Sequence, residues 1–264
     1  MDMNLSGQHV LITGGSKGIG LACAQAFLSE GAKVTLLARQ SQRLQAACAQ
    51  LARDHDPKRI AGLSVDLSVG SAASEAIQTV LQQWGPIDVL VNSAGAARRT
   101  PPDELSIQAW HDAMDAKYFS YLHAIDPVIK HMVDRGRGTV INIIGAGGKM
   151  ANPIHLPGGA ANAALMLVTA GLANAYAAKG IRVNGINPGS TLTERLREGL
   201  QAEARMQGIS EEEALQKSSS RIPMGRMAEP EEIAHVAVFL ASGKASYVNG
   251  AIVTMDGAST PTVL

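Results

Sequence analysis

A glycine-rich segment near the N-terminus has the residue types that bind phosphate groups. The stretch VLITGGSKGIG runs from Val10 to Gly20, between an apolar run and a helical pattern. Glycine lets the backbone turn tightly and approach a pyrophosphate, and the N-terminus of the following helix offers N–H groups and partial positive charge. Because the loop opens a strand–helix–strand unit, it predicts a dinucleotide site rather than a simple tight turn.

Two cations near this loop favour NADP(H) over NAD(H). Proteins that prefer NAD usually carry an acid at the end of the second strand, where it binds the ribose hydroxyls. In this chain Ala38 holds that position, Arg39 follows it, and Lys17 lies inside the glycine loop. Two cations and no acid suit a 2′-phosphate. The alternative is that both are solvated surface charges, as single Lys and Arg residues often are.

The stretch IIGAGGKMANPIHLPGGAAN, residues 143–162, contains little acid–base equipment. It has no serine and no tyrosine, and its ionisable side chains are Lys149 and His155. A histidine titrates in the useful range without much tuning. Both residues are candidates to touch a substrate, and the alternative for each is a solvated loop position.

Short apolar, β-branched runs alternate with longer helical patterns along the chain. This alternation predicts an α/β fold, a Rossmann-type doubly wound parallel sheet of seven strands in a single domain, residues 1–264. Strands that are apolar throughout are typical of a sheet covered on both faces. The expected strands are residues 9–13, 33–38, 60–65, 87–91, 138–144, 181–186 and 251–255. The expected helices are residues 19–30, 41–54, 71–84, 104–135, 159–179 and 229–242.

The stretch from about 190 to 225 departs from this alternation. It predicts two short helices in a lid-like insertion, and Ser210 and Glu213 have the spacing of a capping box. We expect this lid to shape the choice of substrate.

The composition excludes several classes of function. Hydrophobic residues make up 46 % of the 264 residues, which is enough for a large core, and the formal net charge is zero. We therefore expect no nucleic-acid partner. The chain has no run of 18 apolar residues and no secretory signal, so we expect no membrane span and a cytoplasmic protein. Cys23 and Cys48 fit reduced thiols, and no residues have metal-ligand spacing.

Over nearly the whole chain, these features resemble the short-chain dehydrogenase/reductase family. NSAG at residues 92–95 stands where the family has Asn-Asn-Ala-Gly, and Asp66 matches the acid that touches the adenine. NPGSTLT at residues 187–193 matches the Pro-Gly motif that packs on the nicotinamide, and residues 222–242 and 247–257 match the last helix and strand. The resemblance implies cofactor contacts from Gly14, Ser16, Lys17, Gly18, Ile19, Gly20, Arg39, Asp66, Leu67, Asn92, Ala94, Gly95, Asn162, Pro188, Gly189, Thr191 and Thr193.

The catalytic positions of the family all differ in this chain. In the family, Ser and Tyr hold the carbonyl, Tyr gives the proton, Lys lowers the pKa of Tyr, and Asn anchors a water. The positions of Asn, Ser, Tyr and Lys hold Lys117, Gly145, Gly158 and Asn162. No tyrosine has a lysine four residues later, so no shift of register restores the pair. The chain resembles divergent beta-ketoacyl-reductase-like members that lack a perfect tetrad.

Lys117 is the candidate replacement for the missing proton donor. Exchanging an aromatic ring for glycine leaves a cavity on the order of 100 Å³, which Lys117, water or a ligand can fill. A partly buried amine beside the cofactor would donate a proton near neutral pH. The alternative is a solvated or structurally paired lysine. Asn162 keeps two hydrogen-bonding groups for the ribose but supplies no charge.

The sequence therefore predicts an NADP(H)-dependent oxidoreductase that acts on a small carbonyl or hydroxyl compound. One alternative is a cofactor-binding protein without turnover, a pseudoenzyme or sensor, and another is a non-redox enzyme on the same fold. The resemblance also implies a homo-oligomer, a tetramer or dimer, because the family packs the helix expected at residues 159–179 between subunits. Its small residues are Ala160, Ala161, Ala163 and Ala164.

Overall fold

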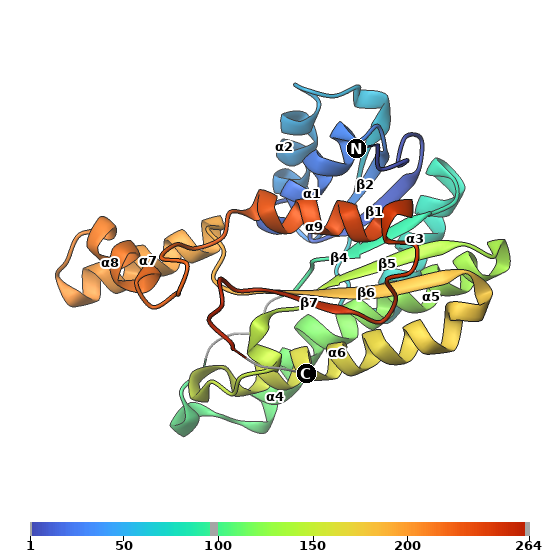
Figure 1. Cartoon of the computed structure of the whole chain (residues 1–264). Helices are drawn as coiled ribbons and strands as arrows, with labels where there is room; N and C mark the ends of the chain where they lie inside the picture. The colour runs from blue at the N-terminus through green and yellow to red at the C-terminus, as the bar shows by residue number, and fades with distance from the viewer. Residues whose placement is uncertain (1, 96–99, 262–264) are drawn as a thin grey trace.

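The computed structural model describes residues 2–95 and 100–261. Its centre is one sheet of seven parallel strands in the order β3-β2-β1-β4-β5-β6-β7 (Figure 1). The strands are β1 His9–Thr13, β2 Lys33–Ala38, β3 Ile60–Ser64, β4 Val89–Asn92, β5 Gly138–Ile143, β6 Ile181–Pro188 and β7 Ile252–Met255. The predicted α/β doubly wound fold is confirmed, with strand ends within two residues of those expected.

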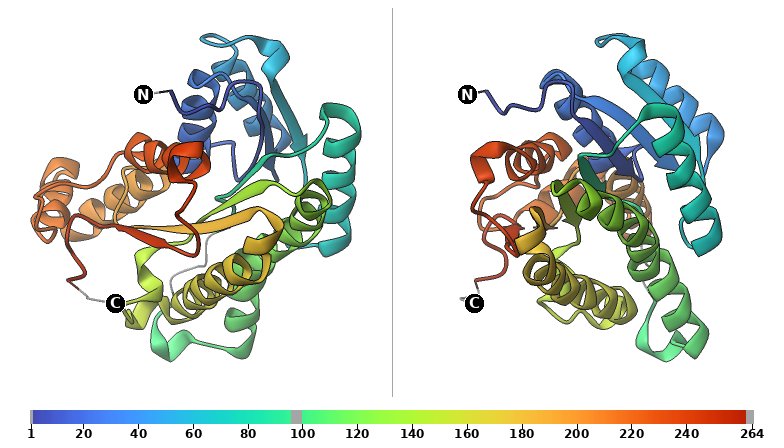
Figure 2. Two further views of the ribbon diagram at one scale, coloured as in Figure 1. Left: turned by 45° about the vertical axis from the view of Figure 1, so that its right-hand side comes forward. Right: turned by 90° about the vertical axis from the view of Figure 1, so that its right-hand side faces the viewer.

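Helices lie on both sides of the sheet (Figure 2). They are α1 Gly18–Ser29, α2 Ser41–Leu51, α3 Gly70–Trp84, α4 Ile107–Ala113, α5 Ser120–Arg135, α6 Leu156–Tyr176, α7 Glu194–Gln207, α8 Glu211–Ser219 and α9 Pro230–Ala241. One apolar core joins α1, α2 and α9 to the sheet, and a second joins α3, α5 and α6 to it. Because both faces of the sheet are covered, the central strands β1 and β4 are buried along their whole length.

The strand order reverses between β1 and β4, which places a crevice at their carboxyl ends. A chain of fully buried polar side chains runs below it. Thr13 donates to Asn92 (3.3 Å), Asn92 to Asn142 (3.0 Å), and Asn142 to Thr169 on α6 (2.9 Å). These bonds satisfy the buried polar groups and fix the ends of β1, β4 and β5 relative to α6.

The helix predicted over residues 104–135 is interrupted in the structure. A π-helical segment, Met114–Phe119, stands between α4 and α5 and contains Lys117. Gly95, after β4, lies directly against it: a Cβ on Gly95 would overlap the Ala116 carbonyl oxygen and lie 3.2 Å from the Lys117 Cα. The widened turn therefore brings the Lys117 backbone against the end of β4, as π-bulges often do at functional sites.

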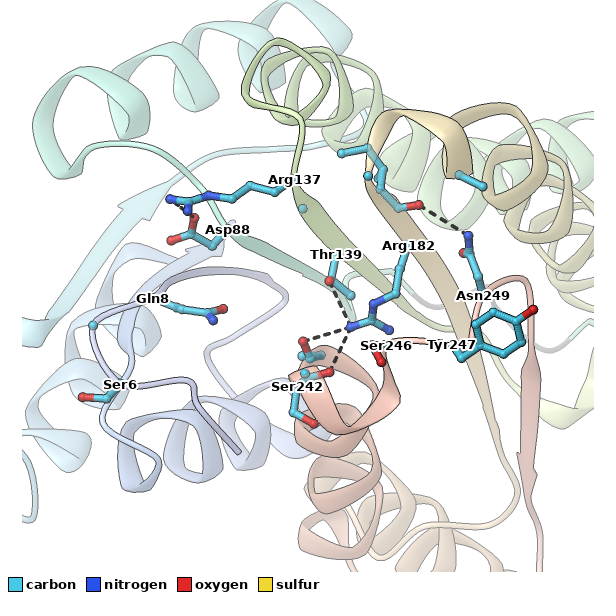
Figure 3. A pocket seen from close by; sticks show the side chains of 17 residues that line it. Ser6, Gln8, Asp88, Arg137, Thr139, Arg182, Ser242, Ser246, Tyr247 and Asn249 are labelled. Atoms are coloured by element: carbon cyan, nitrogen blue, oxygen red, sulfur yellow. Dashed lines mark hydrogen bonds and ion pairs between the residues drawn. The ribbon is translucent and has the colours of Figure 1, made fainter. Parts of the chain in front are cut away.

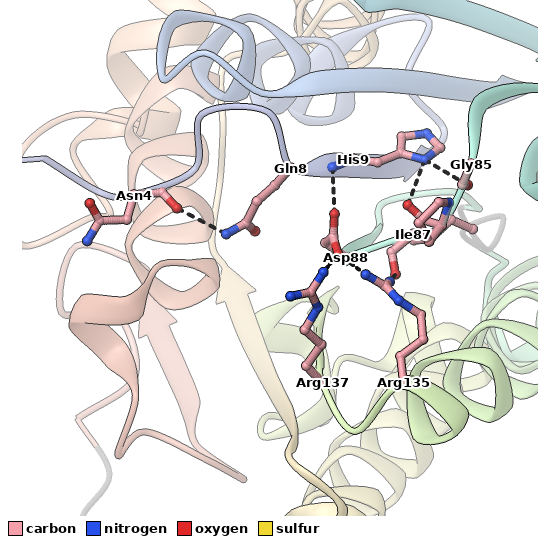
Figure 4. A network of polar contacts seen from close by, with 9 residues as sticks. Asn4, Gln8, His9, Gly85, Ile87, Asp88, Arg135 and Arg137 are labelled. Carbon is pink, nitrogen blue, oxygen red and sulfur yellow. Dashed lines mark hydrogen bonds and ion pairs between the residues drawn. The ribbon is translucent and has the colours of Figure 1, made fainter.

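A polar cluster joins the amino ends of β1 and β4 to the end of α5 (Figure 4). Asp88 accepts the backbone N–H of His9 at 3.0 Å and the Arg135 guanidinium at 2.7 Å. The His9 ring is buried, with Nδ1 near the Gly85 and Pro86 carbonyl oxygens and Nε2 2.8 Å from the Thr35 hydroxyl. This cluster anchors the C-terminal end of α5, the helix that follows the π-helical segment with Lys117.

The two helices expected between residues 190 and 225 are α7 and α8, which project to one side of the sheet in Figure 1. The predicted capping box is present: Ser210 accepts the N–H of Glu213, whose side chain accepts the N–H of Ser210. These helices share a small apolar core of their own, Leu200, Ile222 and Met227. That separate core makes the insertion a compact unit beside the main domain.

One helical stretch has the length and composition of a membrane-crossing helix. It runs over Pro153–Lys179, with a mean hydropathy of 1.4 in its most apolar window. The stretch is not an uninterrupted apolar run, because Asn162 and Thr169 are among the polar residues within it. Core helices of soluble proteins share this length and composition, and this one packs against β6 and the π-helical segment, so the feature is weak evidence for a membrane.

The two cysteines lie on the same side of the sheet. Cys23 is fully buried in α1, and burial raises the pKa of its thiol to about 12. Cys48 is half-buried in α2 and also free. Both match the reduced thiols expected from the sequence.

Candidate functional site

The glycine loop is shaped by close backbone approaches that a side chain would block. Gly14 adopts φ +67°, and its N–H donates to the Leu37 carbonyl at 2.8 Å. A Cβ on Gly14 would lie 2.7 Å from the Ser93 carbonyl oxygen, and one on Gly20 would overlap the Gly14 carbonyl oxygen. The loop therefore lies directly on the end of β4, and its backbone forms a cradle that fits a pyrophosphate.

Thr13 joins the two walls of the crevice, a role that the sequence did not predict. Its hydroxyl accepts the N–H groups of Ser93 (3.1 Å) and Ala94 (3.2 Å). Asn92, the last residue of β4, is fully buried and bonded on both sides. The sequence signal for this role was the position of Thr13, between the first strand and the glycine loop.

The cations near the loop are arranged differently from the expected pair. Lys17 Nζ and Arg43 Nη1 each lie 3.3 Å from the same oxygen of Glu194, the first residue of α7. The charge of Arg39 contributes to the lowered pKa of Asp66. Arg43 lies in the first turn of α2, and nothing in the sequence indicated its pairing with Glu194.

Asp66 lies in a turn after β3 with its carboxylate held in place. Its Oδ1 accepts the N–H of Ser68 at 3.0 Å and the Ser68 hydroxyl at 2.8 Å. Burial raises the pKa of Asp66, but these hydrogen bonds and the charge of Arg39 outweigh it and lower the pKa overall. The next residue, Leu67, is bonded through its carbonyl to the His123 ring at 2.9 Å. Asp66 is therefore a fixed anion at neutral pH.

The Pro-Gly segment faces the glycine loop from β6. A Cβ on Gly18 would lie 3.2 Å from the Thr193 methyl group, so the two segments are in contact. The Thr193 hydroxyl caps α7 by accepting the N–H of Leu196 at 3.3 Å. Gly189, after Pro188, donates its N–H to Met255 at 2.9 Å, and Thr191 pairs with Ala228. The two segments form opposite sides of the crevice.

Lys117 is a buried amine at the ends of β4 and β5. The residue is 8 % exposed, and Nζ donates to the Tyr121 hydroxyl at 2.8 Å and to the Ile143 carbonyl at 3.0 Å. The Tyr121 hydroxyl donates to the same carbonyl. Burial raises the pKa of Tyr121, so this phenol stays neutral.

Glycines let the loop after β5 lie directly on α6. Gly145 adopts φ +134°, and its Cβ would be 3.1 Å from the Asn162 amide nitrogen. A Cβ on Gly148 would lie 2.8 Å from the Ala163 nitrogen. Gly158 is buried in the first turn of α6. The Asn162 amide thus lies over Gly145.

The two weaker candidates lie near this loop. Lys149 Nζ donates to the Thr254 hydroxyl at 3.2 Å, which links the loop to β7. His155 ends the turn before α6, and its Cδ2 lies 3.3 Å from a Cβ on Gly147. Both residues lie on the stretch between β5 and α6 that also contains Gly145. Among the side chains that the structure describes, no group of three or more His, Cys, Asp or Glu residues is placed to hold a metal ion.

A cavity of about 920 Å³ lies at the amino ends of the strands, away from the crevice at their carboxyl ends (Figure 3). It is lined by residues at the amino ends of strands, including Gln8, Asp88 and Thr139. Its central cation, Arg182, is already bonded to Thr139 (3.2 Å) and to the Ser242 carbonyl (3.2 Å). Parallel sheets bind ligands at carboxyl ends, so we assign the site to the glycine-loop crevice despite the size of this cavity.

Comparisons with known proteins agree with this geometry. A family model described as enoyl-(acyl carrier protein) reductase matches residues 14–260. Gluconate 5-dehydrogenase of Gluconobacter oxydans (strain 621H) is 32 % identical over 97 % of this chain and 96 % of its own. D-threitol dehydrogenase of Mycolicibacterium smegmatis is 35 % identical over 98 % of this chain and 95 % of its own.

Solved structures show the same fold over the full length. L-sorbose reductase from Gluconobacter frateurii, complexed with NADPH and L-sorbose, superposes with a TM-score of 0.95 at 31 % identity, covering 100 % of both chains. An NADPH-bound short chain oxidoreductase from Pseudomonas aeruginosa PAO1, described as containing an atypical catalytic center, has a TM-score of 0.88 at 26 % identity. That match covers 97 % of this chain and 98 % of the other.

Proposed function

Because the chain belongs to the short-chain dehydrogenase/reductase family, we propose that it is an NADP(H)-dependent oxidoreductase of carbonyl or hydroxyl compounds, with a site that lacks the Tyr-Lys pair. One observation carries the proposal: a buried amine, Lys117, stands beside a preformed dinucleotide crevice. The NADPH in the solved structures of similar proteins supports the choice of cofactor.

The residues of the crevice fit this cofactor. The backbone at Gly14, Gly18 and Gly20 would hold the pyrophosphate, and Lys17 with Arg43 would hold the 2′-phosphate. A two-cation cradle beside a second strand without a terminal acid suits the extra phosphate of NADP. The other predicted contacts are Ser16, Ile19, Arg39, Asp66, Leu67, Asn92, Ala94, Gly95, Asn162, Pro188, Gly189, Thr191 and Thr193.

Lys117 is the proposed proton donor. The cofactor supplies the hydride when it is bound. A protonated lysine is a donor only, and the neutral Tyr121 hydroxyl and Ile143 carbonyl fix the position of its ammonium. In the direction of reduction, Lys117 would give a proton to the substrate oxygen and regain one from solvent. At the position where the family has a charged lysine, Asn162 supplies an amide donor instead.

The relatives suggest which compounds to test. Their names refer to gluconate, D-threitol, L-sorbose and 3-oxoacyl-[acyl-carrier-protein]. Lys149, His155 and Thr254 give the rim of the site polar groups that suit hydroxylated compounds. We propose a small polyhydroxylated ketone or its alcohol, with the insertion at residues 190–225 acting as the lid over it.

The test begins with calorimetric titration of NADPH and, separately, NADH. We expect NADPH to bind at least about tenfold more tightly. A panel of keto-sugars, keto-acids and a 3-oxoacyl thioester then shows which compound drives NADPH oxidation. With that compound, Lys117→Ala should lower kcat by about 100-fold or more. The control is Lys130→Ala, an exposed lysine of α5 paired with Asp126. Absence of binding by either dinucleotide would overturn the proposal.

One observation favours a cofactor-binding protein without turnover. Both hydrogen bonds of the Lys117 amine described above are to protein acceptors, which is also what a structural lysine would show. Tight NADPH binding, no turnover with any compound of the panel, and loss of stability alone in Lys117→Ala would support this second candidate.

We also propose that the protein is a homo-oligomer joined through α6. The outward side of this helix is apolar: Leu167 is 76 % exposed, and Ala163 and Ala170 are exposed near it. Small residues let two helices approach closely, and exposed apolar surface of this kind marks contact sites. Whether the assembly is a dimer or a tetramer, and the cytoplasmic location, stay predictions.

A further inference from the structure

An ion-pair cluster joins the lid to the cofactor crevice. The carboxylate of Glu194, at the start of α7, lies 3.3 Å from Lys17 of the glycine loop and 3.3 Å from Arg43 of α2, through a single oxygen. All three side chains are about half exposed, at 51 %, 43 % and 48 %. Three segments that are distant in sequence thus meet at one anionic group.

The charges of this cluster are unbalanced. Two cations face one carboxylate, so one unit of positive charge stays uncompensated. A phosphate monoester carries about −1.5 to −2 charges near pH 7 and offers three strong acceptor oxygens. It therefore matches the pair Lys17 and Arg43 better than Glu194 does.

The lid meets this edge of the crevice at the start of α7. Its helices pack on their own core of Leu200, Ile222 and Met227, and the start of α7 touches the loop through the Thr193 methyl group near Gly18. Because Glu194 is the first residue of α7, a change in its ion pairs acts directly on the first turn of that helix.

We propose that Glu194 is a specificity-determining residue that competes with the 2′-phosphate for Lys17 and Arg43. NADPH would break both ion pairs and release the start of α7, whereas NADH would leave them in place. The inference rests on the proposed function, because it requires the crevice to bind a nicotinamide dinucleotide. The proposal also places Arg43 at the 2′-phosphate, where the sequence predicted Arg39.

The test measures binding by calorimetry in wild type, Glu194→Gln and Arg43→Gln. Removing the competing charge should tighten NADPH binding by about three- to tenfold, since exposed ion pairs are individually weak. NADH binding should change by less than about twofold. Arg43→Gln should weaken NADPH and leave NADH unchanged. Glu198→Gln, an exposed acid one turn later on α7, is the matched control.

A second pair of ligands tests whether the gain in affinity depends on the 2′-phosphate. Adenosine 2′,5′-bisphosphate should gain affinity in Glu194→Gln by the same factor as NADPH, and AMP should not. Unchanged or weaker NADPH binding in Glu194→Gln, or an equal gain for NADH, would overturn this inference alone. A wild-type protein that binds no NADPH would overturn the proposed function and this inference with it.

Discussion

The Lys117 amine lies 2.8 Å from the hydroxyl of Tyr121, which follows it by four residues, and both groups donate to the Ile143 carbonyl. The chain thus contains a lysine and a tyrosine at helical spacing, in the order opposite to that of the family's catalytic pair and on the preceding helix. Tyr121 is fully buried, so it holds Lys117 and does not itself face a substrate.

Tyr121→Phe tests this pairing. The variant removes an acceptor for Lys117 and a donor to Ile143, and we expect it to lower the free energy of unfolding by about 1–3 kcal/mol. The protonated amine loses a partner, so reductase activity should fall off at lower pH than in wild type. Thermal unfolding and a pH–rate profile check the two effects. Tyr118→Phe, beside Phe119, should change neither. An unshifted pH profile would show that Tyr121 serves packing alone.

Gly145→Ser restores the residue type that the family has at this position, and we expect it to be harmful. Gly145 adopts φ +134°, which serine rarely does, and its new Cβ would lie 3.1 Å from the Asn162 amide. The strain should cost about 1–3 kcal/mol of unfolding free energy, measured by denaturant titration. In Gly199→Ala, a Cβ in open space on α7 should stabilise by about 0.5–1 kcal/mol. Wild-type stability in Gly145→Ser would mean that the loop adopts another conformation.

Stability should fall in mild acid because of His9. Burial lowers the pKa of His9, and hydrogen bonds to the Gly85 and Pro86 carbonyls offset this only in part. The unfolded chain therefore binds the proton at higher pH than the folded protein. The unfolding free energy should decrease as pH falls below about 6.5 and level off below the folded pKa.

Denaturant midpoints measured across this pH range check the prediction in wild type and His9→Gln. Burial, and then the charge of Arg135, also lower the pKa of His131. His9→Gln should therefore flatten the pH dependence only in part. The exposed His111 provides the control, and His111→Gln should retain the wild-type slope. An identical slope in His9→Gln would remove His9 as the cause.

Leu167→Glu tests the proposed subunit contact. The side chain is 76 % exposed on the apolar side of α6, so a charge there costs little in a monomer and much in a helix–helix interface. We expect a smaller species by size-exclusion chromatography with light scattering. Val69→Glu, at a 50 % exposed position before α3, should keep the wild-type mass. If both variants keep that mass, α6 is not the interface.

The sequence by itself determined the sheet, the helices and the place of the crevice. Apolar runs, glycines and caps act within a few residues, so β1, the glycine loop and the Ser210 capping box could be predicted from local patterns. The residue types at Lys117, Gly145, Gly158 and Asn162 could also be read directly.

Only the tertiary structure decided the partners of these residues. The meeting of Lys17, Arg43 and Glu194 spans more than 170 residues of chain, and nothing in the local pattern of any of them encodes it. The π-helical turn at Lys117 depends on the close approach of Gly95, and the fit of Gly145 against Asn162 depends on a left-handed backbone angle. Such contacts arise from packing between distant segments, which periodicity along the chain does not specify.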